Sequence, residues 1–333
     1  MKRLEGQAPV RYARILGVGA YRPERSVDNA EVCALINSSD AWVQSRSGIR
    51  TRRFAGPHET LEMMAATAAG KALAAAGIEP ADVDCVLVST ISHLRQLPGM
   101  APDLAVRIGA GGAGAFDISA ACAGGCYGLA LADSMVRGGN ARHVVVVGAE
   151  RMRDIIDAED RSLAFLFADG AAAWVVGPSD EPGIGPVAWG SDGEALDALT
   201  MTRTWGEFRD DPELPSPVLY MDGRRVFRWT AGEIAKVCHT ALEKAGVTAA
   251  DLGAFIPHQA NLRITEVLAH DLRLPEHVAV ADDVVTSGNT SSASVPLAME
   301  ALLASGRASS GDLALLAGFG AGLAYAAQVV VLP

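Results

Sequence analysis

The chain carries the same sequence pattern twice, and this duplication constrains its fold more than any other feature. Residues 72–88 (ALAAAGIEPADVDCVLV) and 241–257 (ALEKAGVTAADLGAFIP) each read as an alanine-rich helix, an Ala-Gly stop, a turn and an apolar strand. The two copies lie 169 positions apart, near half of the 333 residues. A repeat of this length indicates a duplicated domain and not a solenoid unit.

A second pair of segments repeats in the same order. Residues 116–150 and 284–320 each read as a short strand, a turn of small residues, a helix, a polar loop and a strand. The strand runs 144–147 (VVVV) and 313–317 (LALLA) are continuous and apolar. Such runs are typical of strands that are buried on both faces of a sheet.

We therefore expect an α/β fold made of two tandem halves. The predicted N-terminal half covers residues 1–178 and the C-terminal half covers 179–333, with a break at Gly-Pro-Ser-Asp. Half of the residues are hydrophobic, which is enough apolar surface for one large core or two fused cores. A cleft between two such halves is a favoured place for a ligand site.

Charge and hydropathy exclude several classes of function. The formal net charge of −11 argues against nucleic acid or an anionic membrane as the main partner, because both require clustered positive charge. No apolar run reaches the length of a membrane span. The first residues, MKRLEGQAPVRYAR, lack the apolar core of a secretory signal. We therefore expect a cytoplasmic location.

The five cysteines form no recognisable metal or disulfide framework. Their spacing is irregular and contains no CxxC pair; they are Cys33, Cys85, Cys122, Cys126 and Cys238. We expect reduced thiols and no metal site. Most of these cysteines should be small buried hydrophobic residues.

Cys122 lies in a turn that joins a predicted strand to a predicted helix over residues 123–137. At the start of a helix, unpaired backbone N–H groups and the helix dipole favour negative charge. We therefore expect a lowered thiol pKa and a nucleophilic Cys122. A small buried cysteine in a tight turn is the alternative that the turn alone leaves open.

Two polar residues follow strand ends in the second half. His258 corresponds to Ser89 by the internal repeat, and Asn289 falls in the turn that corresponds to the Cys122 turn. Both side chains could converge on Cys122, although a structural histidine and a plain polar turn remain open. Residues 318–322 (GFGAG) form either a glycine-rich turn or a backbone N–H donor for an oxyanion. They are not a dinucleotide fingerprint, because a strand follows them.

Four motifs in order resemble a known family. ISAACAGGCYG, FIPHQANLRI, SGNTSSASVPLAM and GFGAGLAYA together look like β-ketoacyl-acyl-carrier-protein synthase III, and the similarity runs nearly end to end. The chain also resembles the priming synthases of bacterial aromatic polyketide pathways. The resemblance implies the thiolase fold, a duplicated αβαβα sandwich of two similar halves, and a homodimer.

The resemblance also implies a mechanism without a permanently bound cofactor. Cys122 attacks an acyl-CoA, and malonyl-acyl carrier protein then loses carbon dioxide and attacks the acyl-cysteine. His258 and Asn289 complete the catalytic triad by binding the carbonyl of the malonyl thioester. The backbone N–H groups of Cys122 and Ala321 form the oxyanion hole.

The resemblance implies binding residues as well. In the CoA site, Trp42 would stack on the adenine, Arg161 would flank it and Arg46 would meet the phosphates. The pantetheine channel would be lined by Gly223, Phe227, Asn261 and Arg263. The acyl pocket would be formed by Leu97, Gly125 and Phe319.

The sequence departs from the family pattern at three places. Gly125 replaces the usual aromatic residue and is expected to widen the space beside the nucleophile. Leu97 occupies a position that often limits acyl length across the dimer interface, but leucine there does not define one length. His270 and Asp271 stand where basic residues often bind the carrier protein. Docking of the carrier protein is therefore expected to use Arg224, Arg225, Arg228 and Arg263.

Three functions agree with these features. The main prediction is a decarboxylating condensing enzyme. An acyltransferase of the same fold that uses an alcohol or amine is the second, but an acidic residue would suit that reaction better than Asn289. A non-catalytic partner subunit is the third, although it has no chemical need for Cys122, His258 and Asn289 together. The acyl-CoA primer, and the choice between fatty acid and polyketide synthesis, stay open.

Overall fold

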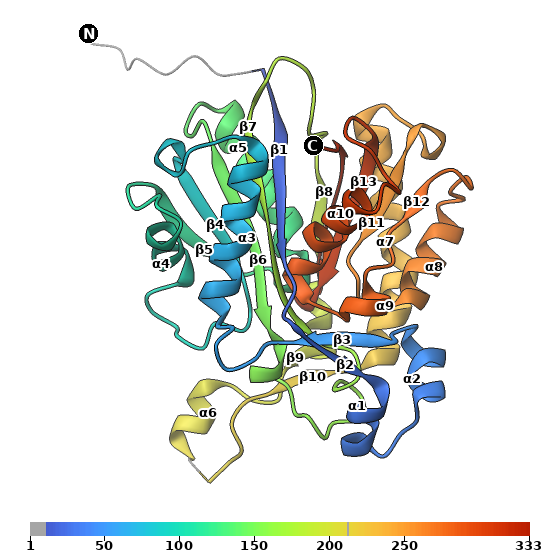
Figure 1. Ribbon diagram of the computed structural model, residues 1–333. Coiled ribbons are helices and arrows are strands. Elements are labelled where there is room, and N and C mark those ends of the chain that lie inside the picture. The colour runs from blue at the N-terminus through green and yellow to red at the C-terminus, as the bar shows by residue number, and fades with distance from the viewer. Residues whose placement is uncertain (1–10, 212) are drawn as a thin grey trace.

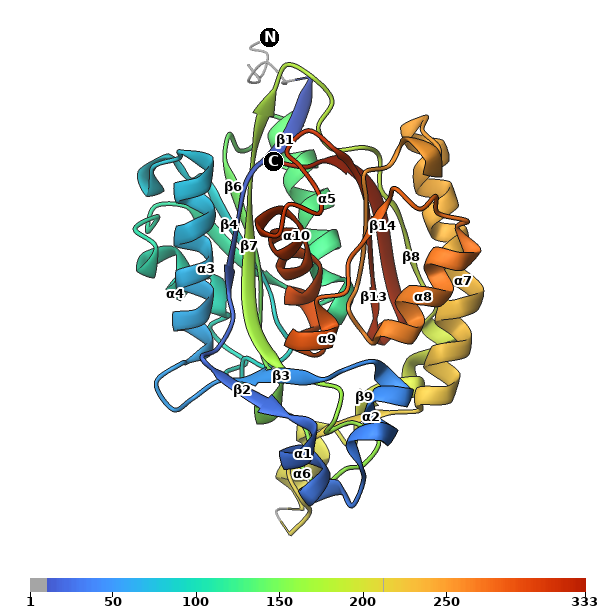
Figure 2. The ribbon, with the colours of Figure 1, turned by 45° about the vertical axis from the view of Figure 1, so that its right-hand side comes forward.

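The computed structural model describes residues 11–211 and 213–333, and these residues form five layers. Two five-stranded sheets alternate with three layers of helices in the order helix, sheet, helix, sheet, helix (Figures 1 and 2). This arrangement confirms the predicted αβαβα sandwich. Residues 1–10, which include most of the segment that we tested for a secretory signal, lie outside the described part of the chain.

The first sheet is built from the N-terminal half of the chain. β4 pairs in parallel with β5 and β6, and β7 pairs antiparallel with β6 and β1. In spatial order the strands are β1 (Tyr12–Tyr21), β7 (Asp169–Ser179), β6 (Val144–Arg151), β4 (Cys85–Ser89) and β5 (Gly114–Ile118). The outer face is covered by α3 (Leu61–Ala76) and α4 (Met100–Arg107).

The second sheet repeats this order with strands from the C-terminal half. In the corresponding order they are β8 (Ala188–Ser191), β14 (Ala324–Val331), β13 (Leu313–Gly320), β11 (Ala254–Pro257) and β12 (Ala279–Val280). The outer face is covered by α7 (Gly223–Ala245) and α8 (Leu262–Asp271). α5 (Gly124–Arg137) and α10 (Ser294–Ala304) form the central layer between the sheets (Figure 2).

The central strands have the continuous burial that their sequences predict. In β6, seven consecutive residues from Val144 to Glu150 are buried, and in β13 all residues after Leu313 are buried. The helix predicted over 123–137 is α5, which begins one residue later. Each central strand packs on helices from both sides, so apolar residues are favourable at every position.

The two halves share one core across the central layer. Trp174 of β7 is fully buried, and its indole N–H contacts the sulfur of Met299 in α10 at 3.1 Å. The same buried cluster contains Leu129 of α5 and Leu316 of β13. β7 ends one residue beyond the predicted boundary at 178, but a boundary between independent folding units stays a prediction.

Shorter elements close one end of the molecule, the lower end in Figure 1. All but one of them, α6, contribute to a buried cluster that draws residues from both halves, such as Val27, Leu163, Leu219 and Leu323. These elements are β2 (Arg25–Asp28), α1 (Asn29–Ile36), α2 (Asp40–Ser47), β3 (Thr51–Phe54), β9 (Leu199–Met201), α6 (Trp205–Asp210), β10 (Leu219–Met221) and α9 (Val284–Ser287). Among the helices of residues 11–211 and 213–333, none has both the length and the apolar character of a membrane span.

Candidate active site

Two equivalent strand-to-helix turns meet between the halves. The 3₁₀ turn Ala121–Ala123 leads into α5, and the 3₁₀ turn Ser291–Ala293 leads into α10. The first residue of each turn has a left-handed backbone, with φ of 44° at Ala121 and 48° at Ser291. Such strained residues cluster at functional sites. The middle residues, Cys122 and Ser292, therefore occupy equivalent positions.

Cys122 lies against the end of β13. A side chain on Gly320 would place its Cβ 2.8 Å from the Cβ of Cys122 and 3.2 Å from its sulfur. Glycine at 320 is therefore required for the strand to approach the turn. Only 6% of Cys122 is exposed. Ala321, the predicted second donor of the oxyanion hole, follows Gly320 directly and begins a 3₁₀ turn.

The environment of Cys122 favours its neutral thiol. Burial raises the pKa of Cys122 to about 12, although a hydrogen bond with Ser291 acts in the opposite direction. An ionised Glu150 would raise the same pKa further. This corrects the expectation of a lowered pKa, because removal of the thiolate from water outweighs the favourable helix terminus.

His258 follows β11 and is held from two sides. Its backbone N–H donates to the carbonyl of Ala317 at 2.7 Å, and its Nδ1 lies 2.7 Å from the hydroxyl of Ser294. The ring of Phe319 packs edge-on against the imidazole, with 5.2 Å between the ring centroids. Burial lowers the pKa of His258 to about 3, so the imidazole is neutral at physiological pH.

Asn289 is fixed by its backbone and by its side-chain oxygen. The backbone N–H donates to Leu166 and the carbonyl accepts from Ala168, both at 2.9 Å. Oδ1 accepts the N–H of Ser291 at 2.9 Å. The side-chain NH₂ group therefore remains for another partner.

Shared neighbours bring the three predicted catalytic residues to one place. Gly320 contacts Cys122, and Ala317 on the same strand binds His258. The segment 289–294 carries Asn289, and it also carries Ser291, which forms a hydrogen bond with the Cys122 thiol, and Ser294, which contacts His258. The site therefore lies between the halves, where the duplication predicts it.

A buried carboxylate at this site was missed by the sequence reasoning. Glu150 ends the buried part of β6 and is 0% exposed. It contacts Ser292 of the second half and the segment 90–92 of the first half. A single acidic residue after the apolar run 144–147 is the only signal that the sequence offers.

The residues predicted for CoA are close to one another. The Arg161 guanidinium lies over the Trp42 ring at 4.8 Å, and that of Arg46 lies 5.9 Å from the ring centroid. Phe165 packs edge-on against Trp42 at 5.1 Å. The exposed arginines and the half-buried indole form a cationic, aromatic surface.

The residues predicted for pantetheine lie on α7 and α8. The Arg263 guanidinium lies 5.7 Å from the centroid of the Phe227 ring. Asn261 caps α8 by accepting the N–H of Ile264 at 3.0 Å, which leaves its NH₂ group as a donor. Gly223 is the exposed first residue of α7.

The three residues predicted for the acyl pocket have different surroundings. Phe319 contacts His258, whereas Leu97 is 86% exposed in this single chain. A side chain at position 125 would place its Cβ 3.0 Å from the carbonyl oxygen of Ser292 and 3.7 Å from Trp174. Position 125 therefore faces the packing between the halves, and this corrects the expectation that its glycine opens space beside the nucleophile.

The four arginines predicted for carrier-protein docking differ in their pairing. Arg225 forms an ion pair with Asp197 at 2.7 Å and also contacts the carbonyl of Glu194. Arg224, Arg228 and Arg263 are exposed. Arg225 is therefore partly neutralised and is the weakest of the four candidates for an acidic partner.

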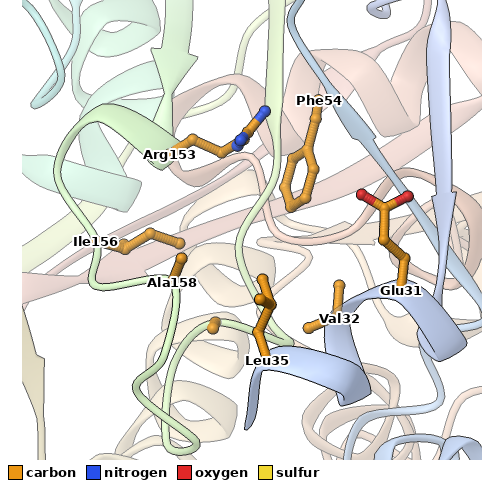
Figure 3. A pocket seen from close by; sticks show the side chains of 8 residues that line it. Glu31, Val32, Leu35, Phe54, Arg153, Ile156 and Ala158 are labelled. Carbon is orange, nitrogen blue, oxygen red and sulfur yellow. The ribbon is translucent and has the colours of Figure 1, made fainter.

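A small pocket is lined by other residues. It has a volume of about 110 Å³ and lies between α1 and the chain that follows β6 (Figure 3). Leu35 and Ile156 line it, and Arg153 stacks on Phe54 at 4.7 Å. None of its lining residues was predicted as part of the site. Within residues 11–211 and 213–333, no cluster of His, Cys, Asp and Glu could hold a metal ion.

Comparison with known proteins agrees with this geometry. The family model described as 3-oxoacyl-[acyl-carrier-protein (ACP)] synthase III matches residues 116–193, and the model of its C-terminal part matches 242–332. A β-ketoacyl-[acyl-carrier-protein] synthase III of Streptomyces coelicolor is 53% identical, with both chains covered in full. The chain belongs to the 3-oxoacyl-[acyl-carrier-protein] synthase III family.

Solved structures of this family match nearly the whole chain. A priming β-ketosynthase from a polyketide biosynthetic pathway is 51% identical with a TM-score of 0.96, over 98% of both chains. A 3-oxoacyl-(acyl carrier protein) synthase III from Pseudomonas aeruginosa is 36% identical with a TM-score of 0.89, over 97% of this chain and 99% of that one. The protein is thus a synthase III-like condensing enzyme, an acyltransferase with the thiolase fold, close to the polyketide priming ketosynthases. The non-condensing alternative is not favoured.

Proposed function

We propose that the enzyme loads an acyl group from acyl-CoA onto Cys122 and joins it to malonyl-acyl carrier protein. In the first step the Cys122 sulfur attacks the thioester carbonyl, and the thiol proton leaves with CoA. Since the thiol is neutral at rest, this proton must be transferred as the sulfur attacks. The product is an acyl-cysteine that is buried between the halves.

In the second step the malonyl thioester loses carbon dioxide and becomes an enolate. His258 and Asn289 donate hydrogen bonds to the enolate oxygen. The carbanion then attacks the acyl-cysteine, and the backbone N–H groups of Cys122 and Ala321 bind the oxyanion. The Cys122 sulfur leaves and takes up a proton, which balances the reaction to a β-ketoacyl carrier protein and carbon dioxide.

The contact of His258 with Ser294 is the observation that carries this role. The Ser294 hydroxyl accepts the N–H of Gln259 at 3.3 Å and lies 2.7 Å from Nδ1 of His258, and we assign the hydroxyl proton to this second contact. A neutral imidazole that accepts at Nδ1 carries its proton on Nε2. His258 is therefore suited to donate from Nε2 to a carbonyl oxygen.

Acyl-CoA is proposed to enter beside Trp42. The adenine ring would insert between the indole and the Arg161 guanidinium, which now lie in contact. Arg46 would bind the phosphates, and the pantetheine would pass Gly223, Phe227, Asn261 and Arg263. Arg224, Arg228 and Arg263 would bind the acidic carrier protein, with Arg225 contributing less because of its ion pair with Asp197.

A homodimer is supported by the free edge of the first sheet. In the described part of the chain β5 pairs with β4 alone, and Phe116 in β5 is 46% exposed. Exposed Leu94 and Leu97 lie on the connection between β4 and α4. Long apolar edges are usually covered, and a second copy would cover this one. We also propose a cytoplasmic location, where the five free thiols stay reduced.

Intact-protein mass spectrometry tests the proposed reaction. The enzyme is incubated with a panel of acyl-CoAs, and malonyl-acyl carrier protein is then added. Acylation at Cys122 followed by a β-ketoacyl carrier-protein product is expected, and the reactive acyl-CoA identifies the primer. Acylation without condensation would overturn the second step. The absence of acylation with every primer would overturn both steps.

A further inference from the structure

Glu150 has no assigned role, although its carboxyl group is fully buried beside the nucleophile. One carboxyl oxygen, Oε2, accepts three hydrogen bonds from the segment that follows β4. The donors are the Thr90 hydroxyl at 3.2 Å, the Ile91 N–H at 3.1 Å and the Ser92 hydroxyl at 2.7 Å. These contacts satisfy Oε2 without any cation.

The other oxygen, Oε1, has a contact that decides the protonation state. The Ser292 hydroxyl lies 2.9 Å from Oε1 and 2.8 Å from the carbonyl oxygen of Ser89. A hydroxyl has one proton, while a carbonyl and an ionised carboxylate can only accept. If Glu150 were ionised, one of the two short contacts would join two oxygens without a full proton between them. A proton on Oε1 removes this conflict, because Glu150 then donates to Ser292 and Ser292 donates to Ser89.

We propose that Glu150 is a neutral carboxylic acid whose own proton joins the two halves, and that it is a positioning residue for the turn that carries Asn289. The role in positioning rests on the proposed function, whereas the protonation state does not. A carboxylic acid that is kept neutral by an apolar site can act as a hydrogen-bond donor in other enzymes. Here the donor would act on the protein itself.

The surroundings of Glu150 agree with a neutral acid. Burial raises its pKa, and its hydrogen bonds with Ser92, Ile91, Ser292 and Ser291 act in the opposite direction. The titratable groups nearby are Cys122 in the opposite turn, Asp169 on β7, and Arg151, which follows Glu150 and pairs with Asp154 at 3.4 Å. An ionised Glu150 would oppose any negative charge on the Cys122 sulfur, so neutrality also suits the nucleophile.

The duplication explains why this residue stands at this place. β6 and β13 are equivalent strands of the two sheets. Glu150 lies near the end of β6 and Gly320 at the end of β13, and each contacts the strand-to-helix turn of the other half. Gly320 contacts Cys122 closely, whereas Glu150 binds Ser292, the counterpart of Cys122. The turn that carries Cys122 is thus left free to react, whereas the turn that carries Ser292 is held by Glu150.

Infrared difference spectroscopy tests the protonation state directly. The spectrum of wild-type enzyme minus that of Glu150→Gln is expected to contain the carbonyl band of a protonated carboxylic acid at neutral pH, shifted in D₂O. Glu59→Gln is the matched control, because Glu59 only accepts hydrogen bonds, from Tyr21, Glu24 and Gly56, and its pKa is lowered. A carboxylate band for Glu150, as for Glu59, would overturn the proposal whether or not the enzyme condenses.

Three substitutions test the role in positioning. Gln supplies both a donor and an acceptor, so Glu150→Gln should keep malonyl decarboxylation within about threefold of wild type, since one altered hydrogen bond changes a rate by about this factor. Glu150→Ala and Ser292→Ala should each lower decarboxylation at least about tenfold, and lower self-acylation less. An equal loss of decarboxylation in Glu150→Gln and Glu150→Ala would overturn the positioning role. An equal loss of decarboxylation and self-acylation in Ser292→Ala would overturn it as well. If wild-type enzyme itself fails to condense, the proposed function fails, and the infrared result still decides the protonation state.

Discussion

At the scale of single residues, the proposed nucleophile Cys122 and the proposed donor His258 are both buried. Cys122 and His258 are both neutral at rest, because burial raises the pKa of the thiol and lowers the pKa of the imidazole. A neutral pair costs less to bury than a thiolate and an imidazolium. The reactive state must therefore arise when the substrate is bound.

The first prediction concerns the pH dependence of Cys122. With a pKa of about 12, the thiolate fraction in the free enzyme should rise about tenfold for each pH unit between pH 7 and 9, because the thiol lies far below half-ionisation. Alkylation of Cys122 by iodoacetamide, followed by peptide mass spectrometry, measures this slope. A rate that is already constant above pH 7 would show instead that the helix terminus lowers the thiol pKa.

The second prediction concerns Asn289. In Asn289→Asp the side-chain oxygen can still accept the N–H of Ser291, but the NH₂ donor is lost. Condensation should fall by about 10²–10³, the usual effect of removing one oxyanion donor, while self-acylation should remain. The two steps are measured separately by single-turnover acylation and by release of β-ketoacyl carrier protein. Equal loss of both steps would contradict the role proposed for Asn289.

At the scale of elements, the duplication predicts which strand ends meet, but not what surrounds them. The apolar runs at 144–147 and 313–317 predict β6 and β13, and the repeat places Cys122, His258 and Asn289 at related ends. The pKa of Cys122, the packing of position 125 and the burial of Glu150 depend on contacts between residues far apart in the chain. Such contacts leave no local pattern, so the sequence could not predict them.

The end of β13 gives a prediction for backbone packing. Gly320→Ala would place a methyl group 2.8 Å from the Cβ of Cys122, so the strand and the turn must separate. The loss of stability should be about 1–3 kcal/mol, and acylation should fall with it. Gly232→Ala in α7 is the matched control, because nothing lies within 4 Å and alanine there should stabilise the helix by about 0.5–1 kcal/mol. Thermal unfolding of both variants measures the difference, and an unchanged Gly320→Ala would refute the close contact.

α2 gives a prediction for CoA recognition. Trp42→Ala should raise the KM for acyl-CoA by roughly 10-fold or more, because base stacking on an aromatic ring contributes about 1–3 kcal/mol. Acyl-pantetheine lacks the nucleotide, so its KM should not change. Steady-state acylation with both substrates measures this contrast. A similar rise for the two substrates would place Trp42 outside the nucleotide site.

At the scale of the whole molecule, the exposed edge of the first sheet is the place where we expect a second copy of the chain to pair. The equivalent strand of the second sheet, β12, has two residues, whereas β5 has five and presents Phe116. The duplicated sheets therefore differ at this edge, and only the first presents a long template for pairing. Leu97, which is 86% exposed, lies on the connection near this edge and would be covered by a partner.

Phe116→Asp should therefore shift the enzyme from dimer to monomer in analytical ultracentrifugation, because a charged side chain at an edge strand opposes pairing. Val106→Asp is a comparison on α4, the helix beside this edge, where the side chain is 67% exposed. If pairing runs along β5, Phe116→Asp should have the larger effect. Self-acylation should fall together with the dimer fraction if the partner's Leu97 helps to close the acyl pocket. A monomeric wild-type enzyme, or a dimer that is insensitive to Phe116→Asp, would show that this edge is not the interface.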